Sequence, residues 1–536
     1  MNARSPHPAF APVAVPAPPL REAVRQWLQA HAPAGVDLRI DSRQVARGDV
    51  FLALPGRRFD GLQFLAQAHA HGASAALVDE GAWAGQPADA APLPLLPVPD
   101  LAAAAGWIAQ DYYRDPSTRL RSIGITGTNG KTSSCQWIAQ LLGQCGLRCA
   151  ALGTLGYGFP GAVDPNELQL TTPDAVNMQR LARRALDQGA RALATEVSSI
   201  GLDQGRVDGF SFHVALFTNL TRDHLDYHAD MAAYGDAKRR LFAWPSLDAA
   251  VLNLDDEFGR RLAAELAARV PARDGRRLQV IGVASDAAAG RQLSLSRLLV
   301  AEAVEHHAGG MRFCVASHAA GTVERVRLQT GLIGEFNVVN LLGVLGVAGA
   351  CGIALSEAAP AVPLLQAPPG RLQRVVAPGG GAAALPLAVV DYAHTPDAIA
   401  KALQALRPLA QSRGGRLCIV FGAGGERDPG KRPVMAAAAA AGADRVVLTS
   451  DNPRGEPPET IIEQLVAGLP AGANAERQAD RACAIELALQ QADGRDVVLI
   501  AGKGHEPYQE IAGQRLPFSD AQAALAALRR RAGEAA

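Results

Sequence analysis

The sequence lacks the features that mark secreted, membrane-bound and nucleic-acid-binding proteins. Its seven cysteines are scattered along 536 residues and form no CxxC pair, so neither a disulfide framework nor a cysteine-based zinc site is supported. Basic and acidic residues balance at 52 each, which disfavours a broad positive face for nucleic acid or for an anionic membrane. Aromatic residues make up only 5%, and the absence of a fixed repeat disfavours a solenoid.

The sequence also lacks a long apolar run. The longest, from Leu341 to Leu355, has 15 residues and four glycines, which is short for a membrane span and predicts a buried helix. Residues 1–20 are rich in proline and alanine and have no continuous apolar core of the kind found in signal peptides, so they predict a disordered tail. We therefore expect a cytoplasmic monomer that binds neither membrane nor nucleic acid.

What is present is ample material for packed cores, with 48% apolar and 19% charged residues. Near the start, the apolar runs Val50–Leu54 and Ala75–Val78 alternate with a helical stretch, Leu62–His71. From Leu120 onward the sequence repeats strand–turn–helix units, which are typical of parallel sheets covered on both faces. The expected fold class is α/β with three domains after the tail: a small α/β domain (21–118), a central domain with a mostly parallel sheet (119–366) and a C-terminal Rossmann-like domain (367–536).

Two breaks set these domain boundaries. A linker near Asp115–Thr118 ends the first domain, and the QAPPGR stretch at 366–371 supplies a proline and glycine break before the last. The last domain contains four apolar runs, LAVVDYAH, LCIVFGAG, RVVLTSDN and DVVLIAGKG, and each ends in a polar loop. That pattern predicts a site at the carboxyl ends of the strands of an open sheet.

The strongest single motif is a glycine-rich loop between a predicted strand and a predicted helix, Gly124-Ile-Thr-Gly-Thr-Asn-Gly-Lys-Thr-Ser133. Glycines allow the backbone to approach phosphates closely, and the helix N-terminus favours negative charge. Lys131 would reach the β- and γ-phosphates, and the Thr132 hydroxyl would bind Mg²⁺. The strict pattern has glycine at the position of Ile125, so a chance glycine-rich turn stays an alternative.

Acidic and imidazole side chains follow later strands. Glu196 comes directly after an apolar run, and His224 lies in NLTRDHLDYH, so both suit a divalent ion near the phosphates. Glu196 could instead be an exposed acid at a helix N-terminus. The His224-x3-His228 spacing could form a zinc pair, but a context of hard oxygen ligands fits Mg²⁺ better. Lys238, considered alone, is an ordinary helical lysine.

Taken together, these residues resemble the Mur ligase family, the ATP-dependent amino-acid-adding enzymes of peptidoglycan synthesis. The motifs that carry the resemblance cover nearly the whole chain: GTNGKTS (127–133), TTPD (171–174), EVSS (196–199), TNLTRDHLDYH (218–228), Lys238, GEFNVVN (334–340), DYAHTPDA (391–398), FGAGGERDPGKRP (421–433), DNPRGE (451–456) and GKGHE (502–506). Within the family, DSR (41–43) and DNPRGE resemble the enzyme that adds the third residue. The resemblance implies a ligase that uses ATP and two Mg²⁺ ions to add meso-2,6-diaminopimelate to UDP-N-acetylmuramoyl-L-alanyl-D-glutamate through an acyl phosphate.

The resemblance also implies a role for each matching position. The positions implied to hold the UDP-sugar dipeptide are Ile40, Ser42, Arg57, Arg58, Phe59, Thr171, Thr172, Ser198, Gln204 and Arg206. Those implied to hold ATP are Gly127, Thr128, Asn129, Gly130, Lys131, Thr132, Ser133, Asn337, Asn340, Arg371 and Asp391. The implied catalytic residues are Lys131, Glu196, His224 and Lys238, and the last three join Thr132 as Mg²⁺ ligands. Lys238 would act as a carbamate, which supplies anionic oxygen to a second Mg²⁺.

The implied amino-acid pocket lies in the last domain, at Arg427, Asp451, Asn452, Pro453, Arg454, Gly502 and Glu506. Diaminopimelate carries a distal carboxylate that Arg454 can bind as a planar fork, whereas lysine would leave the guanidinium unpaired. Asp451, Asn452 and Glu506 can accept from ammonium groups. His394 is a candidate base for the attacking amine, although a structural role or one on the nucleotide side fits equally.

Several positions depart from the family pattern. Arg371-Leu372-Gln373 stands where Arg-Met-Glu is common, Glu426 replaces an aspartate, Pro457 replaces an acid and Leu170 replaces a polar residue. We expect these changes to tune the site without abolishing it. Three alternatives stay open: the same ligase adding L-lysine, a folylpolyglutamate synthase, and a P-loop ATPase switch that changes partners. The two alternatives outside the Mur enzymes leave DNPRGE unexplained.

Overall fold

A computed structural model describes residues 18–56, 60–87, 91–165, 167, 170–269, 277–377, 385–473 and 475–533. The tail expected at 1–20 therefore lies mostly outside the described residues. Its last three residues belong instead to helix α1 (Pro18–His31), which buries Val24 and Leu28. By internal contacts the chain forms two compact units, one made of Met1–Leu299, Ser317–Thr322 and Gly343–Ala358, and one made of Val300–Ala316, Val323–Leu342 and Ala359–Ala536.

The N-terminal part is a four-stranded parallel sheet in the order β1-β2-β3-β4. Its elements after α1 are β1 (Leu38–Arg39), β2 (Val50–Ala53), α2 (Leu65–Ala70), β3 (Ala75–Asp79), α3 (Glu80–Trp83), β4 (Leu95–Val98) and α4 (Leu101–Tyr112). The linker expected near Asp115–Thr118 stays a prediction, and part of this segment is helical. Pro116 begins a one-turn helix, α5 (Pro116–Arg119), because proline at the first helical position is already fixed at a helical φ.

The central sheet has eleven strands in the order β15-β14-β13-β12-β11-β10-β5-β9-β6-β7-β8. Its strands are β5 (Arg121–Thr126), β6 (Cys149–Gly153), β7 (Gly156–Phe159), β8 (Ala162–Asp164), β9 (Ala192–Glu196), β10 (Val214–Phe217), β11 (Ala249–Asn253), β12 (Gln279–Ala284), β13 (Arg297–His307), β14 (Gly310–Ala319) and β15 (Thr322–Thr330). Its helices are α6 (Lys131–Gln144), α7 (Ala175–Asp187), α8 (Ser199–Asp203), α9 (Met231–Arg239), α10 (Glu257–Ala267), α11 (Phe336–Ala350) and α12 (Leu355–Ala358).

Strand β5 lies at the centre of the parallel part, between β10 and β9. Thr126 pairs with Phe217 and Ile125 pairs with Glu196, so the three strands end nearly level. The chain moves from one side of β5 to the other between β9 and β10, which makes this edge a topological switch point where loops diverge and leave room for a ligand. The expected parallel arrangement is confirmed from β12 to β6, whereas β7 and β8 extend the sheet with antiparallel pairs.

The C-terminal sheet has the order β16-β17-β21-β18-β19-β20, with only β16 antiparallel. Its elements are β16 (Gln373–Val375), β17 (Leu387–Asp391), α13 (Pro396–Ser412), β18 (Leu417–Phe421), α14 (Lys431–Gly442), β19 (Arg445–Leu448), α15 (Pro458–Val466), β20 (Ala475–Arg477), α16 (Arg481–Gln491), β21 (Val497–Ala501) and α17 (Asp520–Arg531). A hairpin of β22 (Tyr508–Ile511) and β23 (Gln514–Pro517) stands apart from this sheet.

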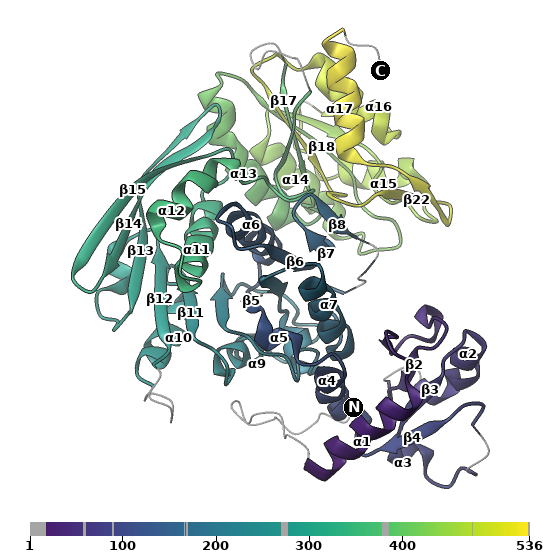
Figure 1. Ribbon diagram of the computed structural model, residues 1–536. Coiled ribbons are helices and arrows are strands. Elements are labelled where there is room, and N and C mark those ends of the chain that lie inside the picture. The colour runs from purple at the N-terminus through teal and green to yellow at the C-terminus, as the bar shows by residue number, and fades with distance from the viewer. Residues whose placement is uncertain are drawn as a thin grey trace. The chain divides into compact units, whose positions relative to one another are not determined.

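Both faces of the C-terminal sheet are buried. Val389, Ile419 and Leu499 pack with α13, α14 and α15, whereas their neighbours Val390 and Val420 pack with α16 and α17. Figure 1 shows these two helix layers on either side of β17 and β18. Successive side chains in a strand point to opposite faces of the sheet. Because helices cover both faces here, nearly every residue of these strands is apolar, which explains the four apolar runs of this domain in the sequence. The doubly wound arrangement expected for this domain is confirmed, while the domain boundaries stay predictions.

The apolar run at 341–355 is helical, as predicted. Leu341, Leu342 and Val347 in α11 are buried, and the helix ends at Ala350 because Gly352 follows in a left-handed conformation. Within the described residues, no helix is both long enough and apolar enough to cross a membrane.

A pair of helical glycines tests how tightly α10 packs on β11. A Cβ on Gly259 would lie 1.9 Å from the carbonyl oxygen of Asn253, so we expect Gly259→Ala to lower the free energy of unfolding by about 1–3 kcal/mol. Gly143 in α6 has open space around it, so Gly143→Ala should raise the free energy of unfolding by about 0.5–1 kcal/mol. Thermal unfolding of both variants checks this, and equal midpoints would contradict the packing described.

Candidate active site

The phosphate loop connects β5 to α6 at the carboxyl edge of the central sheet. Gly127 has φ +148° and Gly130 has φ +85°, both in the region that favours glycine. The loop is tied to the segment after β10, because Thr128 N donates to Asn219 O at 2.8 Å and Asn129 N donates to Asn219 Oδ1 at 2.9 Å. Strand, turn and helix N-terminus therefore take the arrangement that binds anions.

Two lysines converge on one carbonyl of this loop. Lys131 Nζ donates to Gly127 O and Thr128 O, each at 2.9 Å, and Lys238 Nζ donates to Gly127 O at 2.9 Å. Lys238 is only 1% exposed and lies 4.3 Å from the ring centroid of Tyr234. Burial and the nearby Lys131 charge, opposed by Asp223, lower the pKa of Lys238 to about 6. The Lys238 amine is therefore mostly neutral at pH 7.

Glu196 ends β9 beside the loop and is only 1% exposed. Its Oε2 accepts from Thr132 Oγ1 at 2.9 Å, and its Oε1 accepts from Thr154 N at 2.8 Å. The carboxylate is thus held against the hydroxyl predicted to bind Mg²⁺. A Cβ on Gly153 would lie 2.2 Å from Glu196 Oε1, which shows how closely the backbone approaches this group. Buried hard oxygens of this kind fit Mg²⁺.

The histidines after β10 take different positions. His224 has φ +52°, its Nε2 lies 3.7 Å from Asp223 Oδ2, and its ring lies 6.0 Å from that of Tyr234. His228 Nε2 shares a hydrogen bond of 3.0 Å with Ser199 Oγ. In the part of the chain that the structure describes, no group of three His, Cys, Asp or Glu side chains is arranged to hold a metal. The zinc alternative gains no support, and Mg²⁺ binding by His224 and Glu196 stays a prediction.

A polar strip runs from Glu196 along the edge of the sheet. Thr172 Oγ1 donates to Ser198 Oγ at 3.0 Å, and Arg206 reaches both Thr172 O at 3.0 Å and Gln204 Oε1. Burial lowers the pKa of Arg206. Thr171 Oγ1 lies 3.2 Å from Thr154 Oγ1, which connects it to the same network. The structure therefore brings together all five positions expected here.

The N-terminal positions are only partly tested. Ser42 is buried, donates to Gln67 Oε1 at 2.8 Å and has its carbonyl bonded to His71 Nδ1 at 2.7 Å. Ile40 is half-buried against the apolar core of the first sheet. The three residues expected to complete this site, Arg57 to Phe59, lie outside the described residues.

Four further positions are implied for ATP, and two of them, both asparagines in α11, are hydrogen-bonded to each other. Asn340 Nδ2 donates to Asn337 Oδ1 at 3.1 Å, and Asn337 Nδ2 donates to Ile333 O at 2.7 Å. The Arg371 guanidinium lies 5.1 Å from the ring centroid of Tyr392. Asp391 accepts from backbone N–H groups at 2.8 and 2.9 Å, and burial raises the pKa of its carboxyl group.

A cavity of about 250 Å³ lies at the carboxyl ends of the C-terminal strands. It is lined by Tyr392, His394, Gly422, Ala423, Gly424, Arg427, Lys431, Met435, Asp451, Asn452, Arg454, Gly502 and Glu506. Six of the seven residues expected in the amino-acid pocket line it, and Pro453 does not. His394 Nδ1 bonds the carbonyl oxygen of Tyr392 at 2.8 Å, so Nδ1 carries the proton and Nε2 is left as an acceptor.

Arg454 is held in a left-handed conformation at φ +52° by the hairpin β22–β23. Its N–H donates to Glu510 O at 2.9 Å, and its carbonyl accepts from Ala512 N at 2.7 Å. The guanidinium donates to Gly425 O at 2.7 Å, and its Nε lies 3.6 Å from Glu510 Oε2. The sequence analysis missed Glu510, because the hairpin is not in the sheet and nothing local marks its contact with DNPRGE.

Lys503 is a second residue that the sequence analysis missed. It is fully buried, and its Nζ donates to Asn452 Oδ1 at 2.9 Å and Glu506 Oε2 at 3.0 Å. Asn452 Oδ1 also accepts from Glu510 N at 2.9 Å, while Asn452 Nδ2 donates to Glu506 Oε2 at 2.9 Å. That Asn452 accepts from a substrate ammonium group stays a prediction, because its oxygen here accepts from the Lys503 ammonium group and from Glu510 N. Both acceptor positions of its oxygen are occupied, so this side chain offers an N–H group to the cavity.

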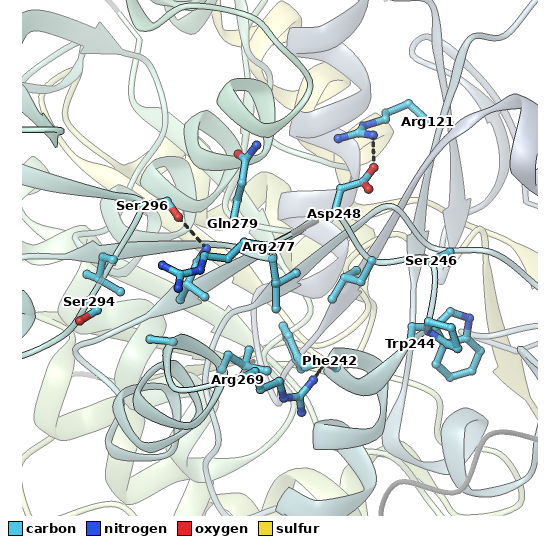
Figure 2. Close-up of a pocket in the computed structure, with 17 residues that line it drawn as sticks. Arg121, Phe242, Trp244, Ser246, Asp248, Arg269, Arg277, Gln279, Ser294 and Ser296 are labelled. Atoms are coloured by element: carbon cyan, nitrogen blue, oxygen red, sulfur yellow. Dashed lines mark hydrogen bonds and ion pairs between the residues drawn. The ribbon is translucent and has the colours of Figure 1, made fainter. Parts of the chain in front are cut away.

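A larger cavity, of about 770 Å³, lies elsewhere (Figure 2). Arg121, Asp248 and Gln279 line it, and they stand at the amino ends of β5, β11 and β12. The loops of a parallel sheet that carry ligand-binding groups lie at the opposite edge. We therefore assign this cavity no function.

The sequence of the chain matches the Mur ligases over most of its length. Residues 37–113 match the Mur ligase family catalytic domain, residues 125–348 match the Mur ligase middle domain, and residues 370–504 match the Mur ligase glutamate ligase domain. The chain therefore belongs to the Mur ligase family, and the resemblance stated from its motifs is confirmed.

Three similar proteins, two known by sequence and one by a solved structure, bear the name of one enzyme within this family. A UDP-N-acetylmuramoyl-L-alanyl-D-glutamate–2,6-diaminopimelate ligase of Acidovorax sp. (strain JS42) is 46% identical over 524 residues, covering 96% of this chain and 98% of that protein. The enzyme of the same name from Xanthomonas campestris pv. campestris (strain 8004) is 48% identical over 496 residues, with coverages of 92% and 94%. A solved structure with this name superposes with a TM-score of 0.65 at 33% identity, covering 92% of this chain and 95% of that one.

The loop geometry predicts the effect of one methyl group. A Cβ on Gly127 would lie 1.9 Å from Thr218 Oγ1, and φ +148° disfavours any side chain there. We expect Gly127→Ala to weaken ATP binding by about tenfold or more, measured by titration with a fluorescent ATP analogue. Gly143→Ala, in the open part of α6, is the control and should leave affinity unchanged. Full affinity in the Gly127 variant would contradict phosphate binding at this loop.

Proposed function

We propose that the chain is an ATP-dependent ligase that joins meso-2,6-diaminopimelate to UDP-N-acetylmuramoyl-L-alanyl-D-glutamate. The observation that carries the proposal is the 250 Å³ cavity in which Arg454 and Glu506 place opposite charges at the ends of neighbouring loops. The relatives that span 92–96% of the chain and bear this enzyme's name support it. In this proposal the loop from Gly127 to Ser133 binds the ATP that the ligation consumes.

The first step activates a carboxylate. The free D-glutamate carboxylate attacks the γ-phosphate of ATP, the bond from that phosphorus to the β–γ bridging oxygen breaks, and ADP leaves. The product is an acyl phosphate, and Lys131 stabilises the charge on the transferred group. Thr132 and Glu196 would hold one Mg²⁺, and His224 with carbamylated Lys238 would hold a second. Bound Mg²⁺ supplies charge neutralisation on the phosphate oxygens. The polar strip from Thr171 to Arg206 binds and orients the dipeptide.

The second step forms the amide. The diaminopimelate amine attacks the acyl carbon, phosphate leaves, and the amine must first lose its proton. His394 is the favoured base because its Nε2 is an acceptor on the cavity wall. Water must be kept from the acyl phosphate during this step, since hydrolysis would waste the activated group.

The cavity groups favour diaminopimelate over lysine. Arg454 and the N–H of Asn452 suit a carboxylate, whereas Glu506 suits an ammonium group. Lysine has no distal carboxylate for the Arg454 guanidinium to bind, so that guanidinium would keep only Glu510 and the Gly425 carbonyl as partners. A P-loop switch would need no such cavity, and a folylpolyglutamate synthase would need no N-terminal domain of the Mur ligase type.

We place this activity in cytoplasmic peptidoglycan precursor synthesis, and hence in cell-wall formation, cell shape and division. The proposed enzyme is a monomer whose partners are the UDP-sugar dipeptide, diaminopimelate and ATP. No nucleic acid or membrane takes part in the proposed reaction.

The amino-acid assignment is tested by ATP-dependent phosphate release with the UDP-sugar dipeptide. We expect release with meso-diaminopimelate and not with L-lysine, and loss of activity in Lys131→Ala. Arg454→Ala should lower kcat/KM for diaminopimelate by about 100-fold, because a charge-assisted fork is lost. Arg477→Ala, an exposed arginine of β20, is the matched control and should change little. Release with lysine alone would overturn the role of Arg454, and release with neither would overturn the ligase.

Carbamylation of Lys238 has its own test. The neutral amine reacts with CO₂, and the lowered pKa of about 6 means that the proton is off above pH 6 and on below it. After incubation with ¹³C-bicarbonate, we expect a carbamate signal by NMR that grows from pH 6 to 8 and is absent in Lys238→Gln. That variant should lose about 100-fold in kcat. The exposed Lys401, changed to Gln, is the control and should retain both signal and rate. Full activity of Lys238→Gln would contradict the proposal.

A further inference from the structure

A fully buried ion pair lies next to the amino-acid cavity and lines no part of it. Arg481 is the first residue of α16, and Asp520 is the first residue of α17. Arg481 Nε lies 2.7 Å from Asp520 Oδ1, and Arg481 Nη2 lies 2.7 Å from Asp520 Oδ2, so the pair is bidentate. Both side chains are completely buried.

The rest of the guanidinium binds two strand ends. Arg481 Nη1 donates to Ser450 O at 3.1 Å, and Nη2 donates to Ala501 O at 3.0 Å. Ser450 directly precedes the DNPRGE segment after β19, and Ala501 directly precedes the GKGHE segment after β21. These strands are not neighbours, because β18 lies between them in the sheet. Arg481 therefore spans β18 and links two loops that no ladder hydrogen bond connects.

The two loops linked by Arg481 lie very close together where they leave their strands. A Cβ on Gly502 would lie 2.3 Å from Asp451 Oδ2, so the loops touch where they leave the strands. Gln509 Nε2 adds a second support, donating to Ser450 Oγ at 2.9 Å and to Asp451 O at 2.7 Å. Arg454 and Glu506 lie a few residues beyond these contacts. Their separation therefore depends on the held strand ends as well as on the direct bond from Asn452 Nδ2 to Glu506 Oε2.

A buried ion pair often stabilises a fold no more than well-packed apolar residues of the same size, because burying two charges costs free energy. Stability alone therefore does not explain this pair. A guanidinium offers five N–H donors in a fixed plane. In Arg481 these donors make four hydrogen bonds, two to Asp520 and one each to the carbonyl oxygens that precede the two loops. The side chain thereby connects α16, α17 and both loops. A lysine in its place would keep the charge and lose the geometry.

We propose that Arg481, held by Asp520, is a positioning residue that fixes the separation of the DNPRGE and GKGHE loops and thereby the binding of the amino-acid substrate. The inference rests on the proposed function for the identity of that substrate. Arg481 touches neither substrate nor nucleotide in this role, so its effect falls on the amino-acid KM.

The test compares three variants by steady-state kinetics with each substrate varied in turn. Arg481→Lys keeps the charge, and Arg481→Met with Asp520→Leu removes both charges together, so neither variant leaves an unpaired buried charge. Arg413→Lys is the matched control, because Arg413 binds the carbonyl oxygens of Gly494 and Arg495 at the opposite end of β21. We expect a tenfold or larger rise in KM for diaminopimelate in both Arg481 variants. KM for ATP and for the UDP-sugar dipeptide should stay within about twofold, and the control should match the unchanged chain.

Hydrogen exchange gives a second readout that needs no substrate. Residues 451–456 and 502–506 should exchange faster in Arg481→Lys, while the ends of the strands near Arg413 should not. A rise of all three KM values together, or unchanged KM and exchange, would overturn the inference. Inactivity of the unchanged chain with diaminopimelate would instead overturn the proposed function, and the exchange comparison would then decide the positioning role alone.

Discussion

The chemistry of this protein depends on one geometric constraint, which is that parallel strands place their following loops at a single edge. β5, β9 and β10 end nearly level in the central sheet, so the phosphate loop, Glu196 and the segment that ties the loop all begin at one edge. β17, β18, β19 and β21 do the same in the C-terminal sheet and enclose the cavity. Each sheet thus provides one site, and in each the strand ends fix where side chains start.

Most of this arrangement can be predicted from the sequence, because short stretches of neighbouring residues determine the strands and the loops that follow them. Apolar runs ending in polar loops predict strands with functional ends, and the turn from Gly127 to Gly130 predicts a phosphate loop because only glycine tolerates those backbone angles. Six of the seven pocket residues that the family resemblance implies line the cavity at these strand ends. The roles themselves came from the family resemblance, since nothing in the local pattern distinguished Lys238 from any helical lysine.

The parts that sequence reasoning missed depend on contacts between distant segments. Glu510, in the β22–β23 hairpin, lies close to the Arg454 guanidinium. The buried Lys503 amine and the Glu510 N–H both donate to the side-chain oxygen of Asn452 and so fix the orientation of its amide. Arg481 binds carbonyls 31 and 20 residues away. Partners of this kind set the direction of hydrogen bonds in an amide, so residue type alone could not show that Lys503 and Glu510 N occupy the Asn452 oxygen.

The placement of two lysine amines on the carbonyl oxygen of Gly127 has a chemical consequence. Two ammonium groups sharing one acceptor repel, and burial raises the cost for the less exposed one, so Lys238 is the group that gives up its proton. An uncharged amine is a nucleophile, while a protonated one is not. The same burial that makes Lys238 a poor cation would favour its proposed reaction with CO₂, and the product would carry negative charge beside the positive charge of Lys131. A repulsive pair would become an attractive one, which is a physical reason for a lysine, and no other residue, at this position.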